Sequence, residues 1–224
     1  MANASMTDQD FAKLLSICQE IASTYPEGVV FIGGIAIYLH SINHKETRAL
    51  AEFTHDADFY ISLADLADLR DREEVVANRR LNKHQIIKSG FEFDIYTERH
   101  AALVVPYDQA AAHAVSYDKL RVAGLEHLLV LKLEAYRERR FSAKGQKDAK
   151  DIIRAVLVAD ARGKALDRRR CIAFLSEDHI RLLEQIQRGP EFLSLTKGNA
   201  HDAKRLRDRF SKGIKLLLRR TIQE

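Results

Sequence analysis

The chain is poor in the features that mark secreted, membrane and redox proteins. Its 224 residues include only two cysteines, Cys18 and Cys171, and these form no Cys-x-x-Cys pair. We expect both to be ordinary buried thiols in a reducing compartment. No apolar run approaches the ~20 residues that a membrane-spanning helix needs. The first residues are polar and acidic, unlike a secretory signal. A cytoplasmic location without a membrane partner is therefore expected.

Two common phosphate-binding sequences are also missing. The chain contains neither GxxxxGK[ST] nor GxGxxG, which excludes the P-loop and Rossmann classes. It has no internal repeat and no low-complexity segment. What is present is 46% hydrophobic and 30% charged residues, a composition typical of a folded globular protein with a sizeable core.

Charge is distributed unevenly along the chain. Residues 161–224 contain 16 Lys and Arg against 8 Asp and Glu, whereas the rest of the chain contains 20 against 24. Such a division suits an acidic, metal-holding site joined to a surface that attracts polyanions. A solvated helical surface would have the same composition, so charge alone leaves both interpretations open.

The spacing of hydrophobic residues predicts an α+β chain with a helical C-terminal part. Alternating or β-branched segments predict a small mixed sheet, and spacing near 3.6 residues predicts helices around it. We place one domain at 1–124 and a helical part, which completes the site, at 125–224. The predicted strands are 29–32, 56–63, 85–88, 91–96 and 115–123, and the predicted helices are 7–24, 35–42, 66–78, 125–140, 146–160, 165–188 and 200–221.

Acidic residues stand at alternate positions of one predicted strand. In THDADF, Asp56 and Asp58 point to the same face, with their carboxylates about 4–7 Å apart. Two like charges that close favour a bound cation, and Mg²⁺ prefers hard oxygen ligands shared with phosphates. Asp94, in FEFDIY, lies on the polar face of a second strand. If the two strands are neighbours, the three carboxylates suit two-metal phosphoryl or nucleotidyl transfer. The simpler alternative is a solvent-exposed strand face that carries Asp for solubility.

A glycine pair stands between a predicted strand and a predicted helix. Gly33 and Gly34 would let the backbone approach a phosphate at the helix N-terminus. An ordinary tight turn would need the same residues.

In this order the segments resemble a known superfamily. FIGGIAIYLH, THDADFYI and FEFDIY are similar to the polymerase-β-like nucleotidyltransferases, in particular to the minimal and AbiEii-type members found in toxin–antitoxin systems. The resemblance implies the nucleotidyltransferase fold, a small mixed β-sheet flanked by helices. It also implies that Gly33 and Gly34 bind nucleotide phosphate, and that Asp56, Asp58 and Asp94 are the catalytic, metal-holding residues. The cofactor would be Mg²⁺ or Mn²⁺ and the substrate an NTP such as ATP.

Residues 126–152 resemble a second signature of that family, a lysine-bearing helix followed by K-D-x-x-D. Lys132 falls on an otherwise apolar helical stripe, where a lysine must snorkel out of the core or meet an anion. The resemblance makes Lys132, Lys147 and Asp148 nucleotide-binding residues. Asp148 and Asp151, three residues apart, can orient a lysine or the nucleotide, or simply cap and pair within the helix.

One position departs from the family pattern. The family usually has Arg two residues before the Thr of T-x-D-x-D, and this chain has Glu52 there. Arg48 either replaces that arginine or the contact is absent, which affects substrate choice more than the type of reaction.

These features together predict an enzyme that transfers a nucleoside monophosphate to a hydroxyl. RNA, in particular a tRNA 3′ end, is the expected acceptor, as for a toxin of a toxin–antitoxin pair, because the basic tail suits an RNA backbone. Arg205, Arg209 and Lys212 are the candidate RNA-binding residues. An antitoxin that adenylylates a partner protein, a small-molecule nucleotidyltransferase and a non-catalytic nucleic-acid-binding module are the alternatives. A cognate toxin or antitoxin is a further possible partner.

Overall fold

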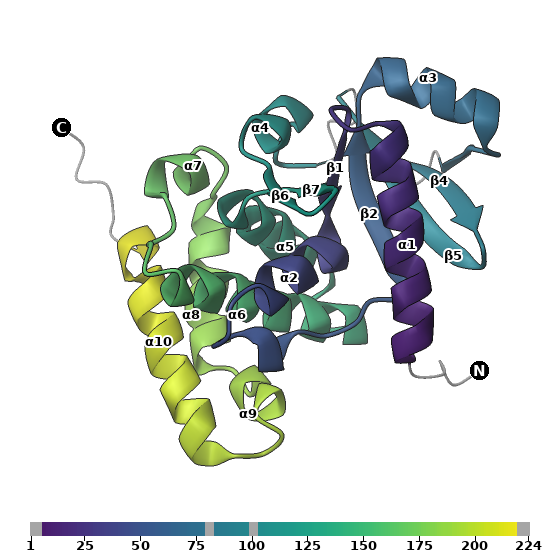
Figure 1. Cartoon of the computed structure of the whole chain (residues 1–224). Helices are drawn as coiled ribbons and strands as arrows, with labels where there is room; N and C mark the ends of the chain where they lie inside the picture. Colours follow the sequence, from purple (N-terminus) through teal and green to yellow (C-terminus); the bar gives the residue numbers. More distant parts are fainter. Residues whose placement is uncertain (1–5, 79–82, 99–102, 219–224) are drawn as a thin grey trace. The chain divides into compact units, whose positions relative to one another are not determined.

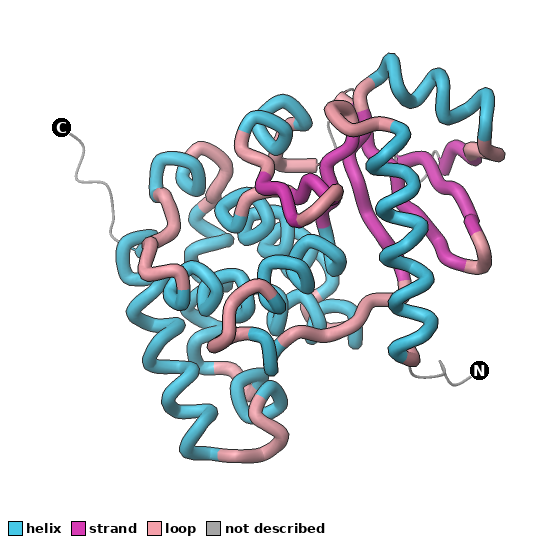
Figure 2. Tube along the Cα trace, viewed as in Figure 1, coloured by secondary structure: helices cyan, strands magenta, loops and turns pink. Residues whose placement is uncertain are grey.

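The computed structural model describes residues 6–78, 83–98 and 103–218, and these form two compact units. The first unit comprises residues 1–39 and 52–124, and the second comprises 40–51 and 125–224. Strands occur only in the first unit, as the magenta segments of Figure 2 show for the described residues. The predicted mixed α+β fold is confirmed.

The first unit is built on a seven-stranded mixed sheet, counted over the described residues, with the order β3-β4-β5-β2-β1-β7-β6. At its centre β2 pairs antiparallel with β1 and parallel with β5. The strands are β1 (Val29–Ile32), β2 (Asp56–Ile61), β3 (Val76–Asn78), β4 (Lys83–Lys88), β5 (Phe91–Thr97), β6 (Val115–Tyr117) and β7 (Leu120–Val122).

One face of this sheet is apolar and is covered by helix α1 (Asp8–Thr24), which runs alongside the strands in Figure 1. Phe59, Phe93 and Ile95 lie on this face and are fully buried. Lys88, whose register position on β4 shares the same face, bonds to Glu20 of α1 at 3.0 Å. The opposite face is therefore the one that carries the acidic side chains.

Among the described residues, three further helices lie wholly or mainly in the first unit. Helix α2 (Gly33–Ile42), whose last three residues are counted in the second unit, continues directly from β1, α3 (Leu63–Arg72) follows β2, and α4 (Tyr107–Ala112) precedes the β6–β7 hairpin. Ser62 caps α3 by accepting a hydrogen bond from the backbone N–H of Asp65 at 3.1 Å.

Three predicted elements of this unit are wrong in extent. The strand predicted at 56–63 ends at Ile61, and Leu63 begins α3. The segment 66–78, expected as one helix, ends its helix at Arg72, and Val76–Asn78 pairs with β4 as an edge strand. The segment 115–123, expected as one strand, is a hairpin that turns at Asp118, where φ is +51°. Asp tolerates this left-handed conformation, but the Asp-Lys pair lacks the glycine that usually announces such a turn.

The second unit consists of helices. They are α5 (Leu125–Arg139), α6 (Ala143–Ala161), α7 (Arg168–Ile172), α8 (Glu177–Arg188), α9 (Glu191–Leu195) and α10 (Ala200–Leu218), together with the short 3₁₀ helix η1 (Arg48–Leu50). Helix α6 forms the centre of this core, since residues 151–159 are all buried. The four apolar residues predicted to face inward from the tail helix are buried, which confirms that prediction: Leu206, Phe210, Ile214 and Leu217.

The predicted helix 165–188 is divided in two. Ser176 starts α8 with a capping box: its hydroxyl accepts from the backbone N–H of His179, and the His179 ring accepts from the backbone N–H of Ser176. Two satisfied helix-end groups at this point favour a new helix over continuation of α7.

Both cysteines are free and buried, as expected. Burial raises the pKa of Cys18 and of Cys171 to about 12, so neither thiol is ionised at neutral pH. Across the described residues, no helix combines the length and apolar character that crossing a bilayer requires.

Candidate active site

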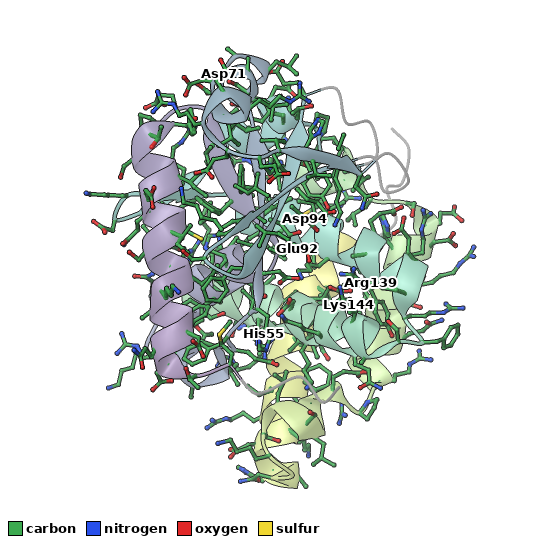
Figure 3. All side chains as sticks on the ribbon, turned by 90° about the vertical axis from the view of Figure 1, so that its right-hand side faces the viewer. His55, Asp71, Glu92, Asp94, Arg139 and Lys144 are labelled. Atoms are coloured by element: carbon green, nitrogen blue, oxygen red, sulfur yellow. The ribbon has the colours of Figure 1, made fainter. Side chains whose placement is uncertain are left out.

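Acidic residues line up on the polar face of the two central parallel strands. Asp58 of β2 is in register with Asp94 of β5, and Asp56 is in register with Glu92. Registered residues of neighbouring strands point to the same face, with their backbones about 4.8 Å apart. Figure 3 shows Glu92 and Asp94 close together on β5. The prediction that the strand of Asp94 adjoins the strand of Asp56 and Asp58 is confirmed.

The glycine pair packs directly against this acidic strand. Gly33 has φ +65°, and a Cβ at that position would lie 2.9 Å from the carboxyl carbon of Asp58. A Cβ at Gly34 would lie 2.7 Å from the hydroxyl oxygen of Thr54. Thr54 in turn donates a hydrogen bond of 2.7 Å to Asp56. Only glycine leaves room for the start of α2 to approach the two aspartates this closely.

Asp94 is held by side chains from the neighbouring strand β4. The ammonium group of Lys83 forms an ion pair with one carboxylate oxygen of Asp94, and both side chains are largely buried. The other oxygen accepts from the side-chain amide of Gln85 at 2.8 Å, and this amide also bonds to Glu92. The cation of Lys83 therefore offsets the repulsion between Asp94 and the facing Asp58.

Sequence reasoning missed Lys83, Gln85 and Glu92 as members of this site. The signal available was the alternation in residues 83–88, where Lys83 and Gln85 share a face. This alternation indicates a strand. Whether Lys83 and Gln85 share the face of Asp94 depends on how the strand pairs with β5.

The donor types at this site fit magnesium. Asp56, Asp58 and Asp94 offer only carboxylate oxygens, the ligands that Mg²⁺ prefers. In the described part of the chain, no group of three or more His, Cys, Asp or Glu side chains is arranged to hold a metal by itself. The three aspartates therefore do not form a complete metal site on their own.

A second charged cluster lies in the second unit, between α5 and α6. Lys132 contacts Asp148 at 3.3 Å and Asp151 at 2.8 Å. Arg139 binds Asp148 through two nitrogens at 2.7 and 3.1 Å, and Arg154 binds Asp151 at 2.7 Å. The anion that Lys132 meets is thus a pair of aspartates on the facing helix, one of the arrangements that its position predicted.

Basic side chains outnumber the two aspartates in this cluster. Burial alone would raise the pKa of Asp151, but Lys132 and Arg154 outweigh burial and hold that pKa below its usual value. Lys132, Arg139 and Arg154 contact the two carboxylates, and Lys147 stands one residue before Asp148. Arg139 keeps 44% of its side chain exposed.

The segment 40–51 is bonded to the helices of the second unit. Arg154 donates to the carbonyl of Leu50 at 2.6 Å, and Arg162 donates to the ring of His44 at 2.9 Å. Arg48, considered above as a substitute for the family's arginine, donates to the carbonyl of Ile42 at 3.1 Å.

The candidate RNA-binding residues of α10 divide into two kinds. Arg205 is 67% exposed, and Lys212 is exposed as well. Arg209 instead pairs with Asp160 at 2.6 Å and with Glu46 at 3.0 Å, which differs from its expected place on the solvent side. Arg219 and Arg220, part of the same basic tail, lie outside the described residues.

Comparison with known proteins identifies proteins of similar fold, at low sequence identity. No protein-family model matches the chain, and no curated protein matches it. Among solved structures, it is similar to an antigenic nucleotidyltransferase-like protein from Paracoccidioides brasiliensis, with a TM-score of 0.51 and 15% identity over 87% of this chain and 95% of that one. It is also similar to JHP933 from Helicobacter pylori, with a TM-score of 0.50 and 14% identity over 95% of each chain. The fold is therefore nucleotidyltransferase-like.

Proposed function

We propose that this protein is a metal-dependent nucleotidyltransferase that moves a nucleoside monophosphate from an NTP to a hydroxyl group. The observation that carries the proposal is the register of Asp58 with Asp94, beside a glycine junction that leads from β1 into α2. The nucleotidyltransferase-like fold of the solved neighbours supports the same reaction class.

In this proposal Asp56 and Asp58 hold Mg²⁺ or Mn²⁺, and Asp94 completes the site. Magnesium, when bound, would activate the attacking hydroxyl and stabilise the leaving pyrophosphate. The N-terminus of α2 at Gly33 and Gly34 presents backbone N–H groups that suit a nucleotide phosphate. Asp94 is the candidate base for the proton of the acceptor hydroxyl, and its bonds to Lys83 and Gln85 orient it.

The charged cluster of the second unit is the candidate nucleotide contact of the helical part. A triphosphate is the anion we propose for it, with Arg139, which keeps 44% of its side chain exposed, as the contact. Lys132 and Asp148 then act mainly by holding Arg139 in place, since Asp148 binds both. Lys147 supplies additional charge from the same helix.

RNA is the acceptor that the charge distribution favours, with a tRNA 3′ end and a toxin–antitoxin role as the specific form of the proposal. The excess of basic residues after position 160 suits a polyanion and disfavours a polycationic small molecule. A co-encoded partner protein as acceptor is the second candidate, because a toxin–antitoxin role allows it equally.

The test is incubation of the full-length protein with each α-labelled NTP, magnesium, and either total RNA or a lysate freed of RNA. We expect label in RNA of tRNA size, and no label when magnesium is chelated. Label that enters a protein band would replace RNA as the acceptor. If no macromolecule or small molecule is labelled, the enzyme proposal is wrong and a non-catalytic binding module takes its place.

A further inference from the structure

The turn between α5 and α6 in the second unit carries an aromatic side chain in a strongly basic segment. Phe141 is 92% exposed, more than any other large hydrophobic residue in the described chain. Residues 137–147 contain five Lys and Arg and one Glu. Single exposed apolar residues are normal on protein surfaces, so the basic surroundings are what distinguish Phe141.

The backbone of this turn is firmly built, so the display of Phe141 is a property of the fold. The hydroxyl of Ser142 donates to the carbonyl of Arg139 at 2.7 Å and accepts from the N–H of Gly145 at 3.1 Å. A Cβ at Gly145 would lie 2.7 Å from Cα of Arg140, so only glycine lets the turn fold back this tightly on α6. Residues 140 and 141 therefore project outward from a fixed base.

A planar group already lies on the aromatic ring. The guanidinium carbon of Arg140 is 4.7 Å from the ring centroid of Phe141. Lys144, exposed in the first turn of α6, lies close to Arg139 in Figure 3. An exposed aromatic ring in a turn with exposed cations matches a nucleobase that stacks while its neighbouring phosphates are neutralised.

We propose that this turn, residues 140–144, is a contact site for single-stranded RNA, with Phe141 as the stacking residue and Arg140 and Lys144 as phosphate contacts. The inference rests on the proposed function in one respect, the choice of RNA as acceptor. Membrane binding would need more apolar surface than one phenylalanine supplies. On α10, by contrast, Arg207 and Arg209 are bonded within the unit, which leaves fewer groups there for RNA.

The aromatic contribution is separated from charge by a variant that removes no charge. Fluorescence anisotropy of a labelled oligouridine of about 12 nucleotides is measured with full-length protein at moderate salt. Phe141→Ala is expected to weaken binding by about 5- to 150-fold, the effect of losing one stacked base. Phe141→Tyr retains a ring and is expected to restore binding. Leu193→Ala, at another exposed apolar residue of the second unit, is the matched control and is expected to bind like the wild type.

The phosphate contacts are tested through salt dependence. Replacing Arg140 and Lys144 by Ala is expected to reduce the slope of log K against log salt concentration by about 1.4, and Phe141→Ala is expected to leave it unchanged. The comparison variant removes Arg205 and Lys212 from α10. If that variant loses oligouridine binding and the turn variants do not, the RNA contact belongs to the tail helix and the proposal is overturned.

Two further results would also overturn it. One is unaltered oligouridine binding by Phe141→Ala. The other is Phe141-dependent binding to anionic lipid vesicles with no binding to oligouridine, which would assign the turn to a membrane surface. Label transfer to RNA is measured on the same preparations. RNA binding that depends on Phe141, without label transfer, contradicts the proposed function and supports this inference. Label transfer that does not depend on Phe141 supports the proposed function and contradicts this inference.

Discussion

Replacing Lys132 by Met should destabilise the second unit through loss of charge rather than loss of packing. Met has a similar length and fills the same space, but it leaves Asp148 and Asp151 without a cation that now lies 3.3 and 2.8 Å away. Removing one partner of a buried ion pair typically costs 3–5 kcal/mol. Because Arg139 and Arg154 still contact the two carboxylates, we expect about 3 kcal/mol.

Urea unfolding followed by circular dichroism measures this loss, since the second unit is helical. Lys144→Met is the matched control: it removes an exposed lysine from α6, and we expect a change within about 0.5 kcal/mol. A loss below about 1 kcal/mol in Lys132→Met would show that the two arginines suffice and that Lys132 has no structural charge to balance.

The pH dependence identifies the cause. Lys132 and Arg154 hold the pKa of Asp151 down against the effect of burial. A carboxyl with a lowered folded-state pKa stabilises the fold above its unfolded pKa of about 3.9, and this stability is lost as the pH falls. Without Lys132, burial raises that pKa again. The variant's loss of folding stability relative to the wild type is therefore largest near pH 7 and shrinks as the carboxyl takes up a proton at lower pH. A deficit that is equal at about pH 7 and about pH 4.5 would refute the electrostatic explanation.

Two further predictions concern the glycine junction and the tail helix. Gly33→Ala should lower the free energy of unfolding by about 1–2 kcal/mol because of its left-handed backbone, and should reduce nucleotidyl transfer about 100-fold by displacing Asp58. Gly90→Ala, at φ +85° in open space, is the control: it should show a similar loss of stability in urea unfolding and retain transfer. Equal transfer activity of the two variants would contradict this prediction. Arg209→Ala should lower the free energy of unfolding by about 1–3 kcal/mol because two carboxylates lose their partner. Arg205→Ala should change it by less than about 0.5 kcal/mol. Equal effects of the two variants in urea unfolding would mean that the ion pairs of Arg209 contribute nothing.

The acidic face was predictable because a strand has a period of two. Asp56 and Asp58 lie on one face from any pairing of β2, and the alternation in FEFDIY places Asp94 opposite an apolar face. That β5 lies beside β2 required more than local pattern, and here the resemblance to a known family supplied the order of strands. The buried side of α10 followed in the same way from a period of 3.6.

What the sequence did not reveal depends on contacts between distant segments. The ion pair of Lys83 with Asp94 and the edge strand Val76–Asn78 both follow from pairing across β4, which local propensity does not determine. Arg209 has the same helical surroundings as Arg205, and only the position of Asp160 and Glu46 makes it an internal residue. Charge counts along a helix therefore overestimate the cations that are available to a ligand.

The most direct test of the central claim compares which phosphate of the NTP is transferred, with and without Asp58. Full-length protein is incubated with magnesium, total RNA, and the preferred NTP labelled at either the α or the γ phosphate. The account predicts that the α label enters the acceptor and the γ label does not, and that Asp58→Ala lowers transfer about 100-fold or more while thermal melting stays unchanged. Transfer of the γ label, or full transfer by the folded Asp58→Ala variant, would contradict nucleotidyl transfer at this carboxylate site.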